Sequence, residues 1–191
     1  GWYIDGLSFL PADLNDIRAS KIDAFICDIS AIEQIEQADG TVNYRRTYRA
    51  CMESIRAARA RVAAHPDLMR LALTGADARL ARKEAQTALF FQIQGADCVE
   101  ESLSQVDEFY LEGLRVLQLT HHYGNVYAGG ALDSDDRGGV NLPLSAKGLF
   151  HCPIVLVAPH LVMRVQESNQ LERTDMVHTV CWLRSQSSRR M

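Results

Sequence analysis

The sequence predicts an α/β protein built from parallel βα repeats, arranged as an incomplete (β/α)8 TIM-like barrel that holds its first four to five strands. Apolar, β-rich runs alternate with helical segments of about ten to twenty residues. The connections are long enough for crossover helices, which make neighbouring strands parallel. The barrel is favoured over an open sheet because polar residues fall toward the carboxyl ends of the strands, where such barrels carry their chemistry. These residues are Asp5, Asp28, Gln94 and His121.

Four apolar runs are predicted to be strands. The first is bounded by Pro11, and the third ends at a glycine turn, as expected for strands that lead into loops. The four runs cover residues 1–10, 24–30, 87–97 and 115–122.

Helical periodicity predicts the connecting segments. Residues 43–65 place apolar side chains along one stripe and arginines on the other faces. Thr74 is expected to cap a helix over 74–86, and residues 67–74 are expected to lead into it. Two shorter amphipathic stretches complete the set, at residues 12–22 and 102–114.

The composition narrows the possible partners and the compartment. The chain has 191 residues, 47% of them hydrophobic, and a net charge of -4, so we expect no nucleic-acid partner. No apolar run approaches the roughly 20 residues of a membrane span. No signal peptide is recognisable, so a cytoplasmic location is expected, although the start at Gly1 leaves open whether residues precede it. The five scattered cysteines form no CxxC pair, and we expect them to be reduced and buried.

Three sequence blocks, taken in their serial order, resemble the membrane (renal) dipeptidase family. YIDGLSFLP (3–11) stands where the family has its first strand, and FFQIQGAD (90–97) where the family has a strand ending in glutamate and glycines. EFYLEGLRVLQLTHHYGN and the glycine-rich loop after it (108–149) are similar to a family signature that contains Leu-Thr-His. The resemblance implies a metal-dependent (β/α)8 barrel, similar to the amidohydrolases, that hydrolyses dipeptides and usually holds two zinc ions.

The resemblance places the family's metal ligands on residues of the wrong chemistry. Its first-strand histidine and aspartate fall on Leu7 and Phe9, which cannot bind zinc. Its bridging glutamate falls on Gln94, a neutral amide that cannot bridge two cations as a carboxylate does. His160 is a weak candidate for a later ligand. We therefore expect that the zinc implied by the family is not bound by this chain.

The resemblance also assigns two substrate contacts. Neighbouring residues of a strand point to opposite faces, so only one of His121 and His122 is expected to face the barrel centre. The resemblance selects His121 as substrate-binding and His122 as structural. Asn125, in the loop that follows, is the second predicted substrate-binding residue.

The resemblance divides the chain into two parts. Residues 1–149 are predicted to form the N-terminal part of a dipeptidase-like barrel, and residues 150–191 a divergent tail. Within the tail a strand is predicted at 154–158, but the helix that should precede it is missing. Two explanations stay open: the chain has lost a segment, or the tail is unrelated or out-of-frame sequence.

Two functions remain open at this stage. The first is a truncated or degenerate member of the dipeptidase family with little or no activity. The second is a non-catalytic scaffold that keeps the barrel face for a small dipeptide-like ligand or a partner subunit. A half barrel leaves open sheet edges and an uncovered apolar face, so self-association is expected with either function.

Overall fold

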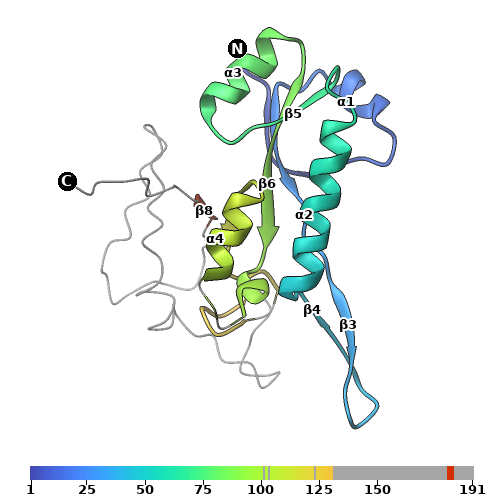
Figure 1. Cartoon of the computed structure of the whole chain (residues 1–191), viewed down its shortest axis with the longest axis vertical. Helices are drawn as coiled ribbons and strands as arrows, with labels where there is room; N and C mark the ends of the chain where they lie inside the picture. The colour runs from blue at the N-terminus through green and yellow to red at the C-terminus, as the bar shows by residue number, and fades with distance from the viewer. Residues whose placement is uncertain (101, 103, 123, 131–179, 183–191) are drawn as a thin grey trace, which may run out of the picture.

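The computed structural model describes residues 1–100, 102, 104–122, 124–130 and 180–182 (Figure 1). In this part of the chain a six-stranded sheet has the order β1-β2-β6-β7-β8, and β5 also pairs with β6. All of its pairs are parallel except that between β7 and β8. The strands are β1 (Ile4–Phe9), β2 (Ala24–Asp28), β5 (Met69–Leu71), β6 (Thr87–Gln94), β7 (Leu114–Gln118) and β8 (Val180–Trp182).

The four predicted strands are confirmed as β1, β2, β6 and β7, each shorter than its predicted range. The prediction that residues 67–74 only lead into a helix is wrong, because they contain the short strand β5. β5 pairs with the first half of β6, with Leu71 beside Leu89. A three-residue strand is too short to show a period of two, so its pairing arises from the tertiary fold.

Helices fill the connections as predicted: α1 (Asn15–Ser20), α2 (Tyr48–Ala63), α3 (Gly75–Lys83) and α4 (Ser104–Leu111), with a 3-10 turn η1 (Ala96–Val99) after β6. The predicted cap of α3 is confirmed, because the Thr74 side chain accepts from the Asp77 amide and Asp77 reciprocates. In the view of Figure 1, α4 and α2 flank β6, and both helices contribute to the same core. None of the helices described is long and apolar enough to cross a membrane.

A β-hairpin corrects the predicted start of the long helix. Residues 43–45 belong to β4 (Val42–Arg45), which pairs antiparallel with β3 (Glu33–Glu36). The turn between them contains Gly40 with φ of 80°, a conformation that glycine adopts without strain. The helix begins only at Tyr48, where the Thr47 side chain accepts a hydrogen bond from the Ala50 amide. The hairpin therefore lies in the β2–α2 connection and projects from the body of the protein (Figure 1).

The two faces of the sheet differ in chemistry. Leu89, Phe91 and Ile93 of β6 join the main core with Ile55 of α2 and Phe109 of α4. Because strand residues alternate between faces, Gln92 and Gln94 point to the side away from these helices. This polar side, near the carboxyl ends of the strands, is where a parallel barrel places its functional residues.

Candidate functional site

Buried polar side chains meet where β2, β6 and β7 end. Asp28, the last residue of β2, pairs in register with Gln92, and Gln94 pairs with Gln118. Asp28 and Gln94 are each 7% exposed, and Gln118 is 5% exposed. Of the four predicted strand-end residues, the structure therefore brings Asp28 and Gln94 together.

A hydrogen-bond chain fixes the ends of β2 and β6. The Asp28 carboxylate accepts from the Ser30 amide at 2.9 Å and from the Ser30 hydroxyl at 2.6 Å. The Ser30 hydroxyl oxygen in turn accepts from the Gln94 backbone amide at 2.7 Å. Asp28 is thus used to shape the loop after β2, which holds the Gln94 backbone in place.

The side-chain amides of Gln94 and Gln118 are used differently. Gln118 Nε2 donates to the Thr120 carbonyl oxygen at 2.7 Å, which ties down the chain after β7. The Gln94 side chain is 7% exposed, and its amide atoms are not among the buried side-chain atoms of the described residues that lack a hydrogen-bond partner.

The first strand places apolar groups where the resemblance implies metal ligands. Leu7 is 44% exposed and Phe9 is 64% exposed. Phe9 pairs with Asp28, so it stands at the carboxyl end of the sheet. Asp5 does not belong to this end: it pairs with Phe25 near the start of β2, which corrects the prediction that placed it there. Asp5 lies near the start of β1, because this strand extends through Phe9, four residues beyond Asp5.

The donor set at these positions does not fit zinc. Leu7 and Phe9 carry no ligand atom, and Gln94 offers a neutral amide in place of a bridging carboxylate. Throughout the described residues, no group of three or more His, Cys, Asp or Glu side chains is placed to hold a metal ion. His160, the remaining predicted candidate, lies outside the described residues, as does the predicted strand at 154–158.

The two adjacent histidines do not point to opposite faces, so that prediction is wrong. β7 ends at Gln118, and His121 and His122 lie in a bend beyond it. Strand alternation no longer applies there, and the centroids of the two imidazole rings are 3.9 Å apart. His121 is half-buried and His122 exposed, next to the polar strand ends. The substrate role of His121 stays a prediction.

Asn125 organises the loop after β7. Its Nδ2 donates to the Leu119 carbonyl oxygen at 2.7 Å, while its Oδ1 accepts from the amides of Tyr127 at 2.9 Å and Ala128 at 3.3 Å. Tyr127 is buried, and its hydroxyl donates to the Glu100 carbonyl oxygen. The Asn125 side chain is therefore engaged within the protein, and its predicted contact with substrate stays a prediction.

Arg46 is a residue of this region that the sequence did not single out. It lies between β4 and α2, and its Nε is buried without a hydrogen-bond partner among the described residues. Its Nη1 lies 3.5 Å from the point where a Cβ on Gly95 would stand. The missing side chain at Gly95 thus leaves room for a guanidinium beside the end of β6. Arg46 is one of several arginines in the segment 43–65 that was predicted to be helical, and no periodic signal distinguishes it from the others.

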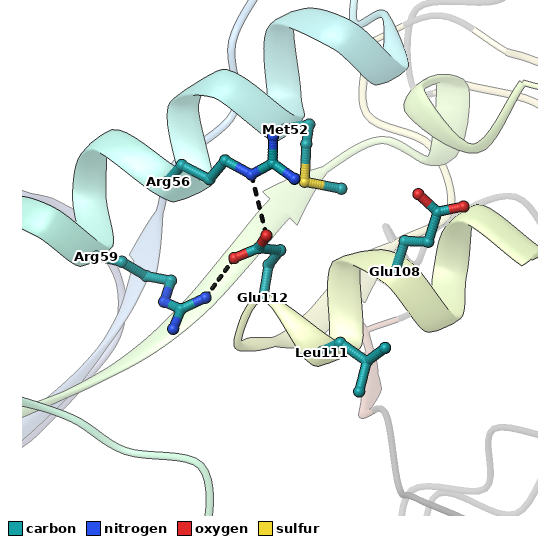
Figure 2. A pocket seen from close by; sticks show the side chains of 6 residues that line it. All are labelled: Met52, Arg56, Arg59, Glu108, Leu111 and Glu112. Atoms are coloured by element: carbon teal, nitrogen blue, oxygen red, sulfur yellow. Dashed lines mark hydrogen bonds and ion pairs between the residues drawn. The ribbon is translucent and has the colours of Figure 1, made fainter.

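A groove on the outer surface is separate from the strand ends. Its lining includes Met52, Arg56 and Arg59 of α2 and, from α4 and the residue after it, Leu111 and Glu112. Figure 2 shows the Glu112 carboxylate between the two arginines, with Arg56 Nε 3.0 Å from it. The charges in this groove are thus paired with each other rather than presented to a ligand.

Parallel strands, α2 and α4 against one face and polar residues at the carboxyl ends define the fold as an incomplete TIM-like barrel. The structure is similar to the crystal structure of an amidohydrolase from Pseudomonas aeruginosa, with a TM-score of 0.64 and 20% identity. It is also similar to that of the probable dipeptidase PvdM from Pseudomonas aeruginosa, with a TM-score of 0.59 and 16% identity.

The family model described as membrane dipeptidase (peptidase family M19) matches residues 7–150, so the chain belongs to this family. The alignments with the two crystal structures cover 79% and 78% of this chain. They cover only 42% and 43% of those proteins, so the chain spans less than half of either one. Comparison with curated proteins finds no significant match.

Proposed function

We propose that this chain is a dipeptidase-like protein that binds a small dipeptide-like ligand at its strand ends but lacks a working zinc site there. The observation that carries this proposal is the chemistry at three positions. Leu7 and Phe9 present exposed apolar side chains, and Gln94 presents a buried amide, where the family resemblance implies zinc ligands. Without a metal-activated water at these positions, we expect little or no hydrolysis of dipeptides.

The ligand class follows from the polar groups at the strand ends. The Gln94 side-chain amide can donate a hydrogen bond to the carbonyl oxygen of a peptide group and accept one from its N–H. Leu7 and Phe9 add apolar surface beside it. A short peptide with an apolar side chain matches both features.

The test measures zinc content, binding and hydrolysis in the same preparation. The 191-residue chain is exposed to zinc, gel-filtered and analysed for metal by mass spectrometry, and a panel of alanine- and glycine-containing dipeptides is assayed for binding and turnover. We expect far less than one zinc per chain and no turnover, with binding measurable by calorimetry. Stoichiometric zinc together with turnover would contradict the proposal.

A matched variant tests the three positions directly. The triple substitution Leu7→His, Phe9→Asp and Gln94→Glu supplies the ligand types that zinc needs, whereas Leu7→Asn, Phe9→Asn and Gln94→Asn supplies polar groups without them. We expect the first variant to bind zinc at least about tenfold more tightly than the second, roughly 1.4 kcal/mol. Equal zinc affinity of the two triple variants would show that these three positions do not form a zinc site.

A scaffold that associates with a second copy is the alternative function, and one observation favours it. β1 is an edge of the described sheet, and Tyr3, Ile4 and Phe9 on or beside it are each more than half exposed. An apolar edge strand offers unpaired backbone groups to another strand. Light scattering after size-exclusion chromatography should detect a dimer that Ile4→Lys disrupts. A monomer at all concentrations would exclude this alternative.

A further inference from the structure

Arg46, between β4 and α2, brings a positive charge to the carboxyl end of β6. Its Cδ and Nη1 lie 3.4 and 3.5 Å from the point where a Cβ on Gly95 would stand, one residue beyond Gln94. Gly95 has a φ of 132°, a conformation that residues with a side chain rarely adopt. The glycine therefore lets the guanidinium reach the end of β6, among the loops where a parallel barrel places its functional residues.

The guanidinium of Arg46 has an unused donor. Its Nε is buried without a hydrogen-bond partner among the described residues, and none of the ion pairs formed by these residues includes Arg46. The Asp97 carboxylate lies 2.8 Å from the same point beside Gly95, yet it makes no ion pair with Arg46. A buried donor on a charged group costs free energy when it has no acceptor, and an acceptor on a bound molecule removes that cost.

Two other arginines show how this fold uses a structural guanidinium. Arg115 donates to three backbone carbonyl oxygens, and Arg61 donates to two, so each joins segments that are distant in sequence. The buried Nε of Arg46 makes no such contact within the described residues. An arginine that keeps a donor free at the strand ends is suited to bind an anion, and a planar carboxylate matches its fork of donors.

We propose that Arg46 binds a carboxylate of the ligand, which makes that ligand a peptide with a free carboxylate rather than a fully neutral one. This inference rests on the proposed binding of a dipeptide-like molecule at the strand ends. The carboxylate can belong to the C-terminus of the peptide or to an acidic side chain, because both present the same two acceptor oxygens. The Nε–H and one terminal N–H of the guanidinium donate to these two oxygens.

The test measures by calorimetry how the folded chain binds three peptides. Ala-Ala has a free C-terminal carboxylate, Ala-Glu-amide has one only on its side chain, and Ala-Ala-amide has none. We expect the parent chain to bind at least one of the first two about tenfold more tightly than Ala-Ala-amide. A preference for Ala-Ala would assign the carboxylate to the C-terminus, and a preference for Ala-Glu-amide would assign it to a side chain. Equal binding of all three would overturn the inference.

Substitutions show whether Arg46 is the group that recognises the carboxylate. Arg46→Met should abolish the preference and leave the affinity for Ala-Ala-amide unchanged. Arg46→Lys keeps the charge without the planar fork and should retain only part of the preference. Arg45→Met alters the exposed neighbouring arginine and should bind all three peptides as the parent chain does.

The outcomes separate this inference from the function on which it rests. If Arg46→Met kept the full preference for a carboxylate, the inference would fail and the proposed function would stand. If the parent chain bound none of the three peptides, the proposed function would fail, and the inference with it.

Unfolding in urea gives a readout that needs no ligand. The Nε of Arg46 has no partner to lose among the described residues, so the urea midpoint of Arg46→Met should equal or exceed that of the parent chain. A fall as large as that of Arg115→Met would assign Arg46 to the fold instead of to the ligand and would overturn the inference.

Discussion

Gln94 and Gln118 are direct partners on the parallel strands β6 and β7, and both are buried, yet the two residues are tied to the protein through different groups. Gln118 Nε2 donates to the Thr120 carbonyl oxygen. Gln94 is tied instead through its backbone amide, which donates to the Ser30 hydroxyl oxygen. The Gln118 side chain therefore holds the chain after β7, whereas the Gln94 backbone is joined to the loop after β2.

This difference predicts unequal effects of one substitution. Gln94→Met keeps the backbone hydrogen bond to Ser30 and replaces only the side-chain amide, so the free energy of unfolding should change by less than about 0.5 kcal/mol. Gln118→Met removes the hydrogen bond to the Thr120 carbonyl oxygen and should lower the free energy of unfolding by about 1 kcal/mol. Urea unfolding of both variants checks this. Equal destabilisation would show that the Gln94 side chain is held as firmly as that of Gln118.

The Ser30 hydroxyl links the ends of β2 and β6, so Ser30→Ala should destabilise the protein. The change leaves the backbone amide of Gln94 without its acceptor and removes one of the two hydrogen bonds from Ser30 to Asp28. We expect a loss of about 1–2 kcal/mol in urea unfolding. Ser102→Ala, which alters only an exposed serine pair, is the control and should cost less than about 0.5 kcal/mol.

The sequence predicted the βα alternation and the main strands because those signals are local. The apolar run at 87–97 and the helical stripe after Tyr48 each follow from side-chain periodicity and burial. The β3–β4 hairpin was missed because residues 43–47 continue the helical stripe in sequence, although Tyr44 is 70% exposed in β4. Where a helix begins depends on its cap, here Thr47, more than on that stripe.

The candidate site could be predicted only in part. The resemblance identified Leu7, Phe9 and Gln94 by their order along the chain. Periodicity locates the end of a strand to within a few residues at best. The position of Asp5, the close approach of the His121 and His122 rings and the engagement of Asn125 all depend on where strands end. The approach of Arg46 to Gly95 joins distant segments, so no local pattern contains it.

Arg115 is buried at 6% exposure and clamps three segments, so its removal should be costly. Its Nε donates to the Leu73 carbonyl oxygen at 3.0 Å, and its Nη1 donates to those of Tyr110 at 2.9 Å and Leu114 at 2.7 Å. Burial lowers the pKa of the guanidinium, but an arginine side chain stays charged in proteins. Arg115→Met should lower the free energy of unfolding by about 2–4 kcal/mol.

Lysine should not rescue this position, because one compact ammonium cannot reproduce the planar fork that reaches these carbonyls. Arg115→Lys is therefore expected to lose nearly as much stability as Arg115→Met in urea unfolding. Arg18→Met is the surface control: Arg18 pairs with Asp67, both side chains are more than 60% exposed, and a change below about 0.5 kcal/mol is expected. If Arg115→Lys kept the full free energy of unfolding, the charge at this position, and not the three hydrogen bonds, would stabilise the protein.

Glu112 should give the protein a small acid-dependent stability. The hydrogen bond from Arg56, with further help from Arg59, lowers the pKa of its carboxyl. A lowered pKa in the folded state contributes stability above the unfolded value of about 4.3, and this contribution is lost as the pH falls through the folded pKa. Glu112→Gln should thus lower the free energy of unfolding by about 1 kcal/mol or less at pH 7 and leave it unchanged near pH 3. Thermal midpoints across this range, with Glu53→Gln as the exposed control, measure it.

Asn125 should prove necessary for the loop after β7. Asn125→Ala removes three hydrogen bonds at once, so we expect faster hydrogen exchange at the Tyr127 and Ala128 amides. Asn125→Asp keeps the Oδ1 acceptor but loses the donor to Leu119, so these two amides should stay nearly as protected as in the parent chain. If Asn125 instead acted only on a ligand, both variants would exchange like the parent and differ from it in dipeptide binding alone. The comparison of the two variants therefore separates a loop-holding asparagine from a substrate-binding one.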